Sequence, residues 1–386
     1  MRGYLLIALL LLAPAGVLAD EVDSALAAIS AVGPEGQGHA KAIAAWKRLS
    51  RSKPADLPRI LAGLDGANPL AANWIRAAIE TIAEKALSAN GKLPAKALEA
   101  FVLDREHSPR ARRLAYEWLA KADPTASDRL IQGMADDPSV EFRRDAVARL
   151  IADAEKLPAD DPAAKPIYGQ ALAAARDKDQ IDDLAARLRK LGETVDLARH
   201  FGFVREWKLI GPFDNTDKKG FAVAYPPESN PDIDFSAAQQ GKAGTVEWFE
   251  HASTEEYGVV DLNQAIGKNM GAVAYAAASF ESDSDQVVDI RVVCTNAVKI
   301  WLNGKLIASH EVYHTGVTID QYIARGELKA GPNTILLKVC QNEQTDEWAQ
   351  KWQFQLRVCD ATGTAILSRN RLAQRETAAG QANTPQ

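Results

Sequence analysis

Residues 298–307 read Val-Lys-Ile-Trp-Leu-Asn-Gly-Lys-Leu-Ile, and this stretch decides the fold class of the C-terminal half of the chain. Apolar and polar side chains alternate along it, which is typical of a strand with one buried face. The pair Asn303-Gly304 lies between two such runs and is a strong hairpin signal, because both residue types accept the positive φ angles of a two-residue turn. The stretch predicts a β-hairpin with strands at 297–302 and 305–308.

The sequence around this hairpin has the same character from residue 205 onward. Further strands are predicted at 287–293, 333–341 and 352–359, each bounded by turn-forming residues. Several short strands separated by turns are typical of a β-sandwich, which we expect to cover residues 205–369. The polar stretch at 370–386 lacks the apolar residues needed to fold, so we expect a disordered tail.

The N-terminal half follows a different period. Residues 22–198 are rich in Ala and Leu, with apolar positions three and four apart, as in amphipathic helices. The pattern Arg-x-Ala-apolar-x-x-apolar starts at Arg76, Arg113 and Arg144, at spacings of 37 and 31 residues, with a second helical segment between copies. Each copy follows a predicted helix start, marked by Pro69, Pro109 or Pro138. Repeats of this length predict an α-solenoid over residues 20–198. The expected fold class is therefore an all-α solenoid, a hinge at 199–204 and an all-β jelly-roll sandwich.

Four stretches resemble known families. Residues 136–146 resemble the second half of a HEAT repeat, with its acidic-Pro turn before a helix. Residues 298–307 and 328–339 are similar to galactose-binding-like jelly rolls of the kind attached to β-galactosidase-type glycoside hydrolases. Residues 207–215 resemble the first strand of such domains in large secreted proteins of Planctomycetes-type bacteria. The HEAT resemblance implies docking of a protein partner, and the jelly-roll resemblance implies carbohydrate binding or the bracing of a neighbouring domain.

The first 19 residues match a secretory signal. Arg2 supplies the positive charge, residues 4–12 are almost entirely apolar, and small or apolar residues precede the expected cleavage after Ala19. The apolar run is interrupted at Pro14 and Gly16, and it is shorter than the roughly 20 residues that span a bilayer. We expect a periplasmic or extracellular protein with no membrane attachment after cleavage.

Charge and cysteine content narrow the function classes further. The chain has 45 Lys and Arg against 51 Asp and Glu, a net charge of −6, so no basic footprint indicates a nucleic-acid partner. Three cysteines, Cys294, Cys340 and Cys359, lie in β-type segments. Free, buried thiols are favoured. A Cys340–Cys359 disulfide is the alternative, because the two segments are expected to be neighbouring strands.

Residues 310–314 read His-Glu-Val-Tyr-His, a literal H-E-x-x-H motif. On a helix, His310 and His314 share a face and bind zinc, and Glu311 acts as the general base. In a strand the two histidines lie about 13 Å apart, too far for one ion. The preceding hairpin and the following Gly316 leave little room for a helix. We therefore expect a surface loop and keep a zinc peptidase as the alternative.

Paired aspartates hold calcium in related sugar-binding lobes of the anthrax protective-antigen type. The corresponding residues in this chain are Thr295 and Asn296. Asp283 and Asp285 lie one strand earlier, in a Ser-rich loop, and are a weak alternative as calcium ligands. A solvated turn is favoured there, because Asp and Ser stabilise turns locally.

Aromatic and planar polar residues gather between residues 341 and 353. Carbohydrate sites typically combine an aromatic platform with planar polar groups. The candidate ligand-binding residues are Tyr313, Asn342, Gln344, Trp348 and Trp352. Alternatively, Trp348 and Trp352, four residues apart, form one apolar face of a short packed helix.

Few other features of the sequence indicate catalysis. The sequence contains no G-x-S-x-G elbow, Walker loop or dinucleotide-binding motif, and we expect neither a catalytic residue nor a cofactor. The expected function is an exported scaffold whose helical repeats dock an unknown protein partner, while its sandwich binds a glycan or braces the assembly. The alternatives are the zinc peptidase and a non-catalytic accessory module of a glycoside-degrading system.

Overall fold

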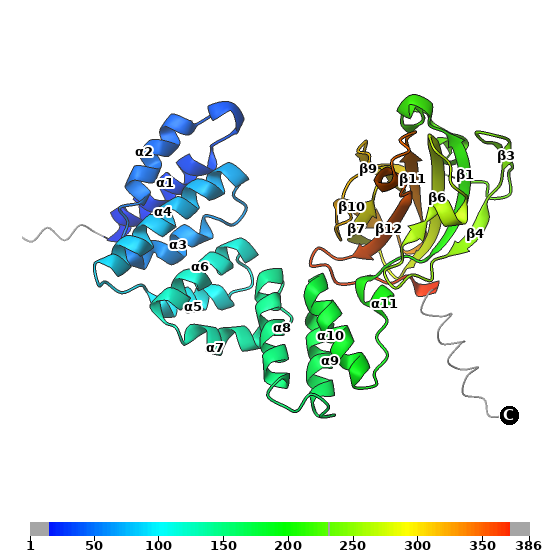
Figure 1. Cartoon of the computed structure of the whole chain (residues 1–386). Coiled ribbons are helices and arrows are strands. Elements are labelled where there is room, and N and C mark those ends of the chain that lie inside the picture. Colours follow the sequence, from blue (N-terminus) through cyan, green and yellow to red (C-terminus); the bar gives the residue numbers. More distant parts are fainter. Residues whose placement is uncertain (1–14, 231, 371–386) are drawn as a thin grey trace, which may run out of the picture. The chain divides into compact units, whose positions relative to one another are not determined.

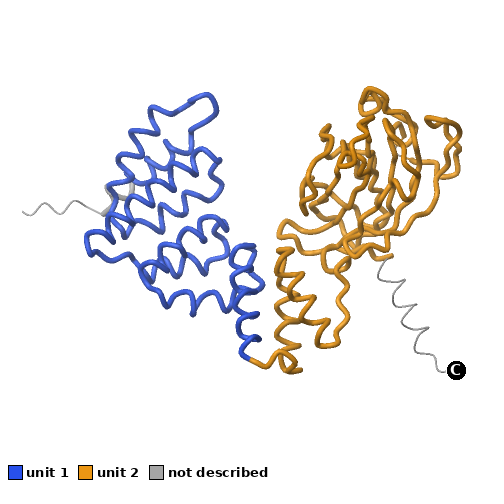
Figure 2. The backbone as a smooth tube through the Cα atoms, viewed as in Figure 1, with its two compact units in different colours: residues 1–156 blue, residues 157–386 orange. Residues whose placement is uncertain are grey.

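The computed structural model describes residues 15–230 and 232–370, and it combines helices with antiparallel sheets. Two compact units divide the chain, Met1–Lys156 and Leu157–Gln386 (Figure 2). The predicted disordered tail, from 371 on, and the first 14 residues of the expected signal lie outside the described residues. The first helix runs from Ala15 through Ala19, the expected cleavage point. Cleavage there stays a prediction.

The first unit consists of helices joined by short turns (Figure 1). These helices are α1 (Ala15–Ser30), α2 (His39–Leu49), α3 (Leu57–Ala62), α4 (Pro69–Ser88), α5 (Ala95–Leu103), α6 (Pro109–Ala122), α7 (Ala126–Leu130) and α8 (Val140–Ala154). Short 3₁₀ turns occur at η1 (Pro34–Gly36), η2 (Pro54–Asp56) and η3 (Ile131–Gly133).

The predicted helix starts at Pro69 and Pro109 are confirmed. Proline suits the first helical turn, where its missing N–H has no partner in any case. The preceding residues, Asn68 and Ser108, cap the helices by accepting hydrogen bonds from free backbone N–H groups. The start marked by Pro138 differs, because α8 begins two residues later, at Val140, after the cap residue Ser139.

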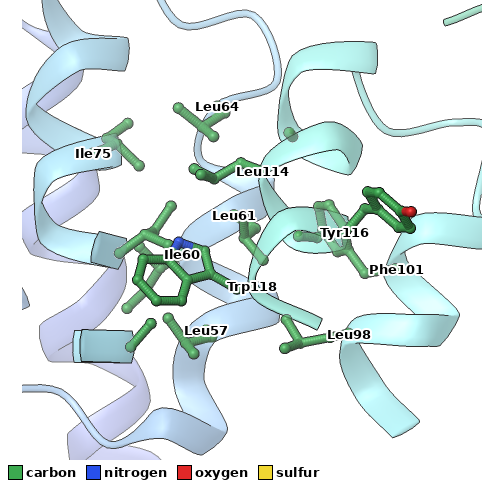
Figure 3. Packing of buried hydrophobic residues seen from close by; sticks show 14 of the residues in the cluster. Leu57, Ile60, Leu61, Leu64, Ile75, Leu98, Phe101, Leu114, Tyr116 and Trp118 are labelled. Atoms are coloured by element: carbon green, nitrogen blue, oxygen red, sulfur yellow. The ribbon is translucent and has the colours of Figure 1, made fainter. Parts of the chain in front are cut away.

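Apolar side chains from α3, α5 and α6 share one core (Figure 3). Within it, the guanidinium of Arg112 donates to both carboxylate oxygens of Asp137 at 2.8 Å. The two side chains are only 1% and 2% exposed. This ion pair braces the acidic-Pro turn before α8, since Asp137 also accepts a hydrogen bond from the Ser139 N–H.

The second unit begins with α9 (Ala164–Ala174), α10 (Lys178–Lys190) and α11 (Leu197–Phe201). The compact unit thus starts after Lys156, whereas the composition changes near residue 200. The expected hinge at 199–204 is instead a packed segment. Phe201 and Phe203 are each 1% exposed, and the Val204 N–H donates to the Leu356 carbonyl at 2.9 Å.

Two antiparallel sheets follow, in the strand orders β4-β1-β6-β11-β8-β9 and β10-β7-β12-β5, together with a small β2-β3 ribbon. The strands are β1 (Glu206–Asp214), β2 (Gln239–Gln240), β3 (Thr245–Val246), β4 (Phe249–Ala252), β5 (Val260–Asp261), β6 (Ala272–Ser282), β7 (Gln286–Cys294), β8 (Ala297–Leu302), β9 (Lys305–His310), β10 (Tyr322–Leu328), β11 (Gly331–Gln341) and β12 (Gln353–Cys359). Short helical turns are η4 (Thr216–Phe221), α12 (Pro226–Ser229), α13 (Leu262–Ala265) and η5 (Glu347–Ala349).

The predicted hairpin is confirmed. Asn303 and Gly304 have φ angles of 50° and 76°, and Leu302 pairs with Lys305 across the turn. Apolar residues of both sheets, among them Ile300 of β8 and Leu356 of β12, form one core.

The outer face of the six-stranded sheet carries a second apolar cluster under the segment that follows β1. Lys338 of β11 lies fully buried there. Its ammonium donates to the carbonyls of Phe221 and Val223 at 3.3 and 2.5 Å, and to Glu228 Oε1 at 3.1 Å. No local pattern in the sequence predicts this contact between the sheet and the segment after β1.

The cysteines are free and buried. The possible Cys340–Cys359 bridge is not formed, because β11 and β12 belong to different sheets and not to neighbouring strands. Burial raises the pKa of Cys340 to about 12 and that of Cys359 to about 11, so both thiols stay protonated at neutral pH.

Candidate functional site

Most of the candidate ligand-binding residues lie at one end of the sandwich. The strand register places the ends of β1, β9 and β11 together with the starts of β6 and β8. The loops that follow β9 and β11 therefore meet at this end. We call Tyr313, His314, Asn342, Gln344 and Trp348 the Trp348 cluster.

Trp348 is the most exposed large apolar side chain among the described residues, at 63%. Its ring meets that of His314 edge to face, with centroids 5.4 Å apart. His314 Nε2 lies 2.9 Å from Asn342 Oδ1, an oxygen that also accepts the Gln344 N–H at 3.2 Å. The aromatic surface thus lies beside the His314 imidazole, which contacts Asn342, whereas the side-chain amide of Gln344 donates to Asp346 at 3.0 Å.

Tyr313 is half-buried and ties its loop to the sheet. Its hydroxyl lies 3.2 Å from the amide nitrogen of Asn215, which also donates to the Gln341 carbonyl at 2.9 Å. Burial raises the pKa of Tyr313 to about 12, so the hydroxyl stays protonated at neutral pH. The Lys218 ammonium lies 5.2 Å from the centre of the Tyr313 ring and adds a cation at this edge. Sequence reasoning missed Asn215 and Lys218, because 98 and 95 positions separate them from Tyr313.

Trp352 does not belong to this surface, and its assignment as a ligand residue is wrong. It is 0% exposed, and its indole N–H donates to the Val339 carbonyl at 3.3 Å inside the sandwich core. The alternative of one packed helix is also wrong. The 3₁₀ turn covers only Glu347–Ala349, and the following extended segment carries Trp352 between the sheets while Trp348 faces solvent.

The H-E-x-x-H segment is not helical. β9 ends at His310, and residues 311–318 have no regular secondary structure, which confirms the predicted loop. The His310 ring stacks on Tyr322 with centroids 4.0 Å apart, whereas His314 lies beside Asn342. The helix that a zinc peptidase needs is therefore missing. In the part of the chain that the structure describes, no three His, Cys, Asp or Glu side chains converge on a metal position.

The two aspartates considered for calcium are held by cations. Asp285 accepts the Ala330 N–H at 2.8 Å and lies 3.1 Å from the Lys329 ammonium. The backbone hydrogen bond from Ala330 lowers the pKa of Asp285. Asp283 pairs with Arg369 at 2.9 Å. The two carboxylates therefore serve separate contacts.

Sequence reasoning also missed a hollow of about 640 Å³ beside β1, β4, β6 and β11. Its lining includes Lys208, Phe235, Ser279 and Thr334. Lys208 pairs with Glu250 at its rim. Neither a motif nor a spacing in the sequence indicates this hollow, because its walls come from distant segments.

No family model and no curated protein matches this chain. A β-glucosidase from Kluyveromyces marxianus in complex with glucose is similar at 14% identity and a TM-score of 0.23, over 45% of this chain and 18% of that one. A β-glucuronidase from an uncultured Clostridium sp. shows 15% identity and a TM-score of 0.25, over 41% and 29%. One from Faecalibacterium prausnitzii shows 13% and 0.22, over 41% and 31%. The chain spans less than a third of each protein, and these scores assign it neither fold nor function.

Among the helices of the described residues, none is both long enough and apolar enough to cross a bilayer.

Proposed function

We propose that the protein is an exported, non-catalytic binding protein whose sandwich binds carbohydrate through the Trp348 cluster. The observation that carries the proposal is the solvent-exposed indole of Trp348 beside the imidazole of His314, which in turn contacts Asn342. A large exposed aromatic ring covers the apolar face of a sugar, while amides and an imidazole bond its hydroxyl groups. The bracing of a neighbouring module in a glycoside-degrading system is the competing role for this half.

We further propose that the helices of the first unit are HEAT-like repeats that dock a protein partner, and that the two sheets form a galactose-binding-like jelly roll. The confirmed helix starts and the buried Arg112–Asp137 pair at the acidic-Pro turn support the first assignment. The confirmed β8–β9 hairpin and the shared apolar core of the two sheets support the second.

A glycan array with the full chain tests the carbohydrate proposal, followed by calorimetry on the glycans that bind. We expect Trp348→Ala to weaken binding by about tenfold or more, because aromatic anchors dominate such contacts. The matched control is Ile323→Ala on β10, which removes a side chain that is 56% exposed elsewhere on the sandwich. Absence of glycan binding, or equal losses in both variants, contradicts the proposal.

A further inference from the structure

Aromatic and apolar side chains of α2 and α4, two helices that contact each other in the first unit, form a surface. His39, Ile43 and Trp46 follow one another at four- and three-residue spacing along α2, and Leu70 and Trp74 are four apart on α4. Residues at these spacings share one face of a helix. The Trp74 ring meets those of His39 and Trp46 edge to face, with centroids 5.2 and 6.4 Å apart. We call these five residues the α2–α4 surface.

The α2–α4 surface is open to solvent. Ile43 and Leu70 are 38% and 44% exposed, and the two tryptophans are half-buried. The other side of α2 packs into the core through Ala42, Ala45 and Leu49. Trp46 and Trp74 pack against that core on one side, so Ile43 and Leu70 are the apolar side chains of this surface that are mainly open to solvent.

Five exposed cations follow the same helix and the turn after it. No acidic residue occurs from His39 to Ala55, although the whole chain is acidic with a net charge of −6. Some other cations of the unit are paired, such as Arg59 with Asp23 and Arg76 with Glu80. The side-chain charges of these five lie within 4 Å of no carboxylate among the residues that the structure describes: Lys41, Lys47, Arg48, Arg51 and Lys53.

The helix dipole explains only part of this charge. Lys47 and Arg48 lie in the last turn of α2, where cations are favourable. Lys41 lies in the first turn, where a cation is unfavourable, and Arg51 and Lys53 lie beyond the helix end. Helix stability alone does not account for the cluster.

We propose that the α2–α4 surface binds an acidic peptide segment of a partner protein, aided by Lys47, which lies one turn after Ile43 on the same side of α2, and by the cations of the turn that follows. This inference rests on the proposed docking function of the helical half and names the chemistry of its partner. Carboxylates of the segment pair with the cations, and its apolar side chains cover Ile43, Leu70 and the tryptophans. An anionic membrane fits less well, because α2 packs its most apolar side into the core and so has little apolar area left to insert.

Fluorescence anisotropy with the full chain tests the proposal. The probe is a labelled peptide of about 15 residues that alternates Glu with Leu, and the control peptide carries Lys at every Glu position. We expect only the acidic peptide to bind. Its affinity falls as ionic strength rises, because charges more than about 10 Å apart are screened at 0.1 M salt.

Matched variants locate the binding site. Lys47→Gln with Arg51→Gln is expected to weaken peptide binding by about tenfold. Ile43→Ser is expected to weaken it while preserving the salt dependence. The control pair is Lys92→Gln with Lys96→Gln, two exposed lysines outside α2 in the same unit. Thermal melting followed by circular dichroism verifies that each variant is folded.

Three results overturn the proposal: no binding of the acidic peptide, equal binding by the Lys47/Arg51 variant and the native chain, or binding of phosphatidylglycerol vesicles in place of the peptide. Glycan binding through the Trp348 cluster is measured on the same variants. If glycan binding is present but the acidic peptide does not bind, only the α2–α4 proposal is contradicted. If the native chain binds no glycan, the carbohydrate proposal itself is contradicted.

Discussion

Trp348 and Trp352 show how far one side chain's role depends on its surroundings. The two residues lie four positions apart, yet one is 63% exposed and the other 0%. The sequence identifies both as candidates for binding or packing. It does not separate them, because the direction of each ring depends on where β12 enters the sheet, which is decided by pairing with distant strands.

Alanine substitutions distinguish these two roles. We expect Trp352→Ala to lower the free energy of unfolding by about 3–5 kcal/mol, because it leaves a cavity in the core. Trp348→Ala is expected to change it by less than about 0.5 kcal/mol, as for most surface substitutions. Urea denaturation measures both. Similar losses in the two variants contradict the assignment of Trp348 to a binding surface.

Asp136 and Asp137 offer a similar comparison in the first unit. Asp137 pairs with Arg112 in the core, whereas Asp136 pairs with Arg105 at the surface and is 78% exposed. Asp137→Ala leaves a buried guanidinium unpaired, and we expect it to cost about 3–5 kcal/mol. Asp136→Ala, the control, is expected to cost less than about 1 kcal/mol. Equal unfolding midpoints for the two variants in urea contradict this account.

Elements with a local signal were predicted best. The β8–β9 hairpin is determined by Asn303 and Gly304, and the start of α4 by Asn68 and Pro69, so neighbouring residues suffice to find them. The partners of a strand depend on contacts far along the chain. The register between β7, β10 and β12, and the charges that it brings together, were not predicted for that reason.

Asp320 joins these three strands through charge. Its carboxylate accepts hydrogen bonds from Arg357 Nη2 and Nε at 2.5 and 2.7 Å, and from Arg291 Nη1 at 2.8 Å. Burial acts to raise the pKa of Asp320, but the two guanidinium groups outweigh it and hold the pKa below its ordinary value. Folding therefore favours the charged carboxylate.

Because the pKa of Asp320 is lowered, the stabilisation that this contact provides depends on pH. Its stabilisation is fully present above the unfolded-state pKa of about 3.9 and is lost as the pH falls toward the lower folded-state value. We expect Asp320→Asn to be less stable than the native chain at pH 7, with the difference shrinking below about pH 4. Asp283→Asn, which alters an exposed pair, is the control. Chemical denaturation across this pH range measures the effect, and a pH-independent difference contradicts it.

At the scale of the whole molecule, composition and compactness divide the chain at different places. Composition changes near residue 200, because it reports local helix or strand preference. The second unit starts after Lys156, because packing joins α9–α11 to the sheets. The contacts responsible include the Arg357 hydrogen bond to the Phe201 carbonyl at 3.3 Å, which no local pattern predicts.

Two fragments test this division. We expect residues 157–386 to unfold in one cooperative thermal transition. A fragment of residues 205–386 lacks Phe201 and Phe203 and leaves their partners on β12 uncovered, so we expect a lower melting temperature or aggregation. Calorimetry and light scattering measure both. Equal melting temperatures for the two fragments contradict the assignment of α9–α11 to this unit.

The buried Lys338 limits how the protein can be engineered. Its ammonium has all its described partners on the segment that follows β1, at Phe221, Val223 and Glu228. If that segment is shortened or replaced by another loop, the buried ammonium of Lys338 loses its partners, so Lys338 must be replaced in the same step. The turn between β2 and β3 is no simpler site for new sequence, because the Lys242 N–H donates to the Pro212 carbonyl at 2.8 Å and the Lys242 ammonium lies 3.3 Å from Asp214.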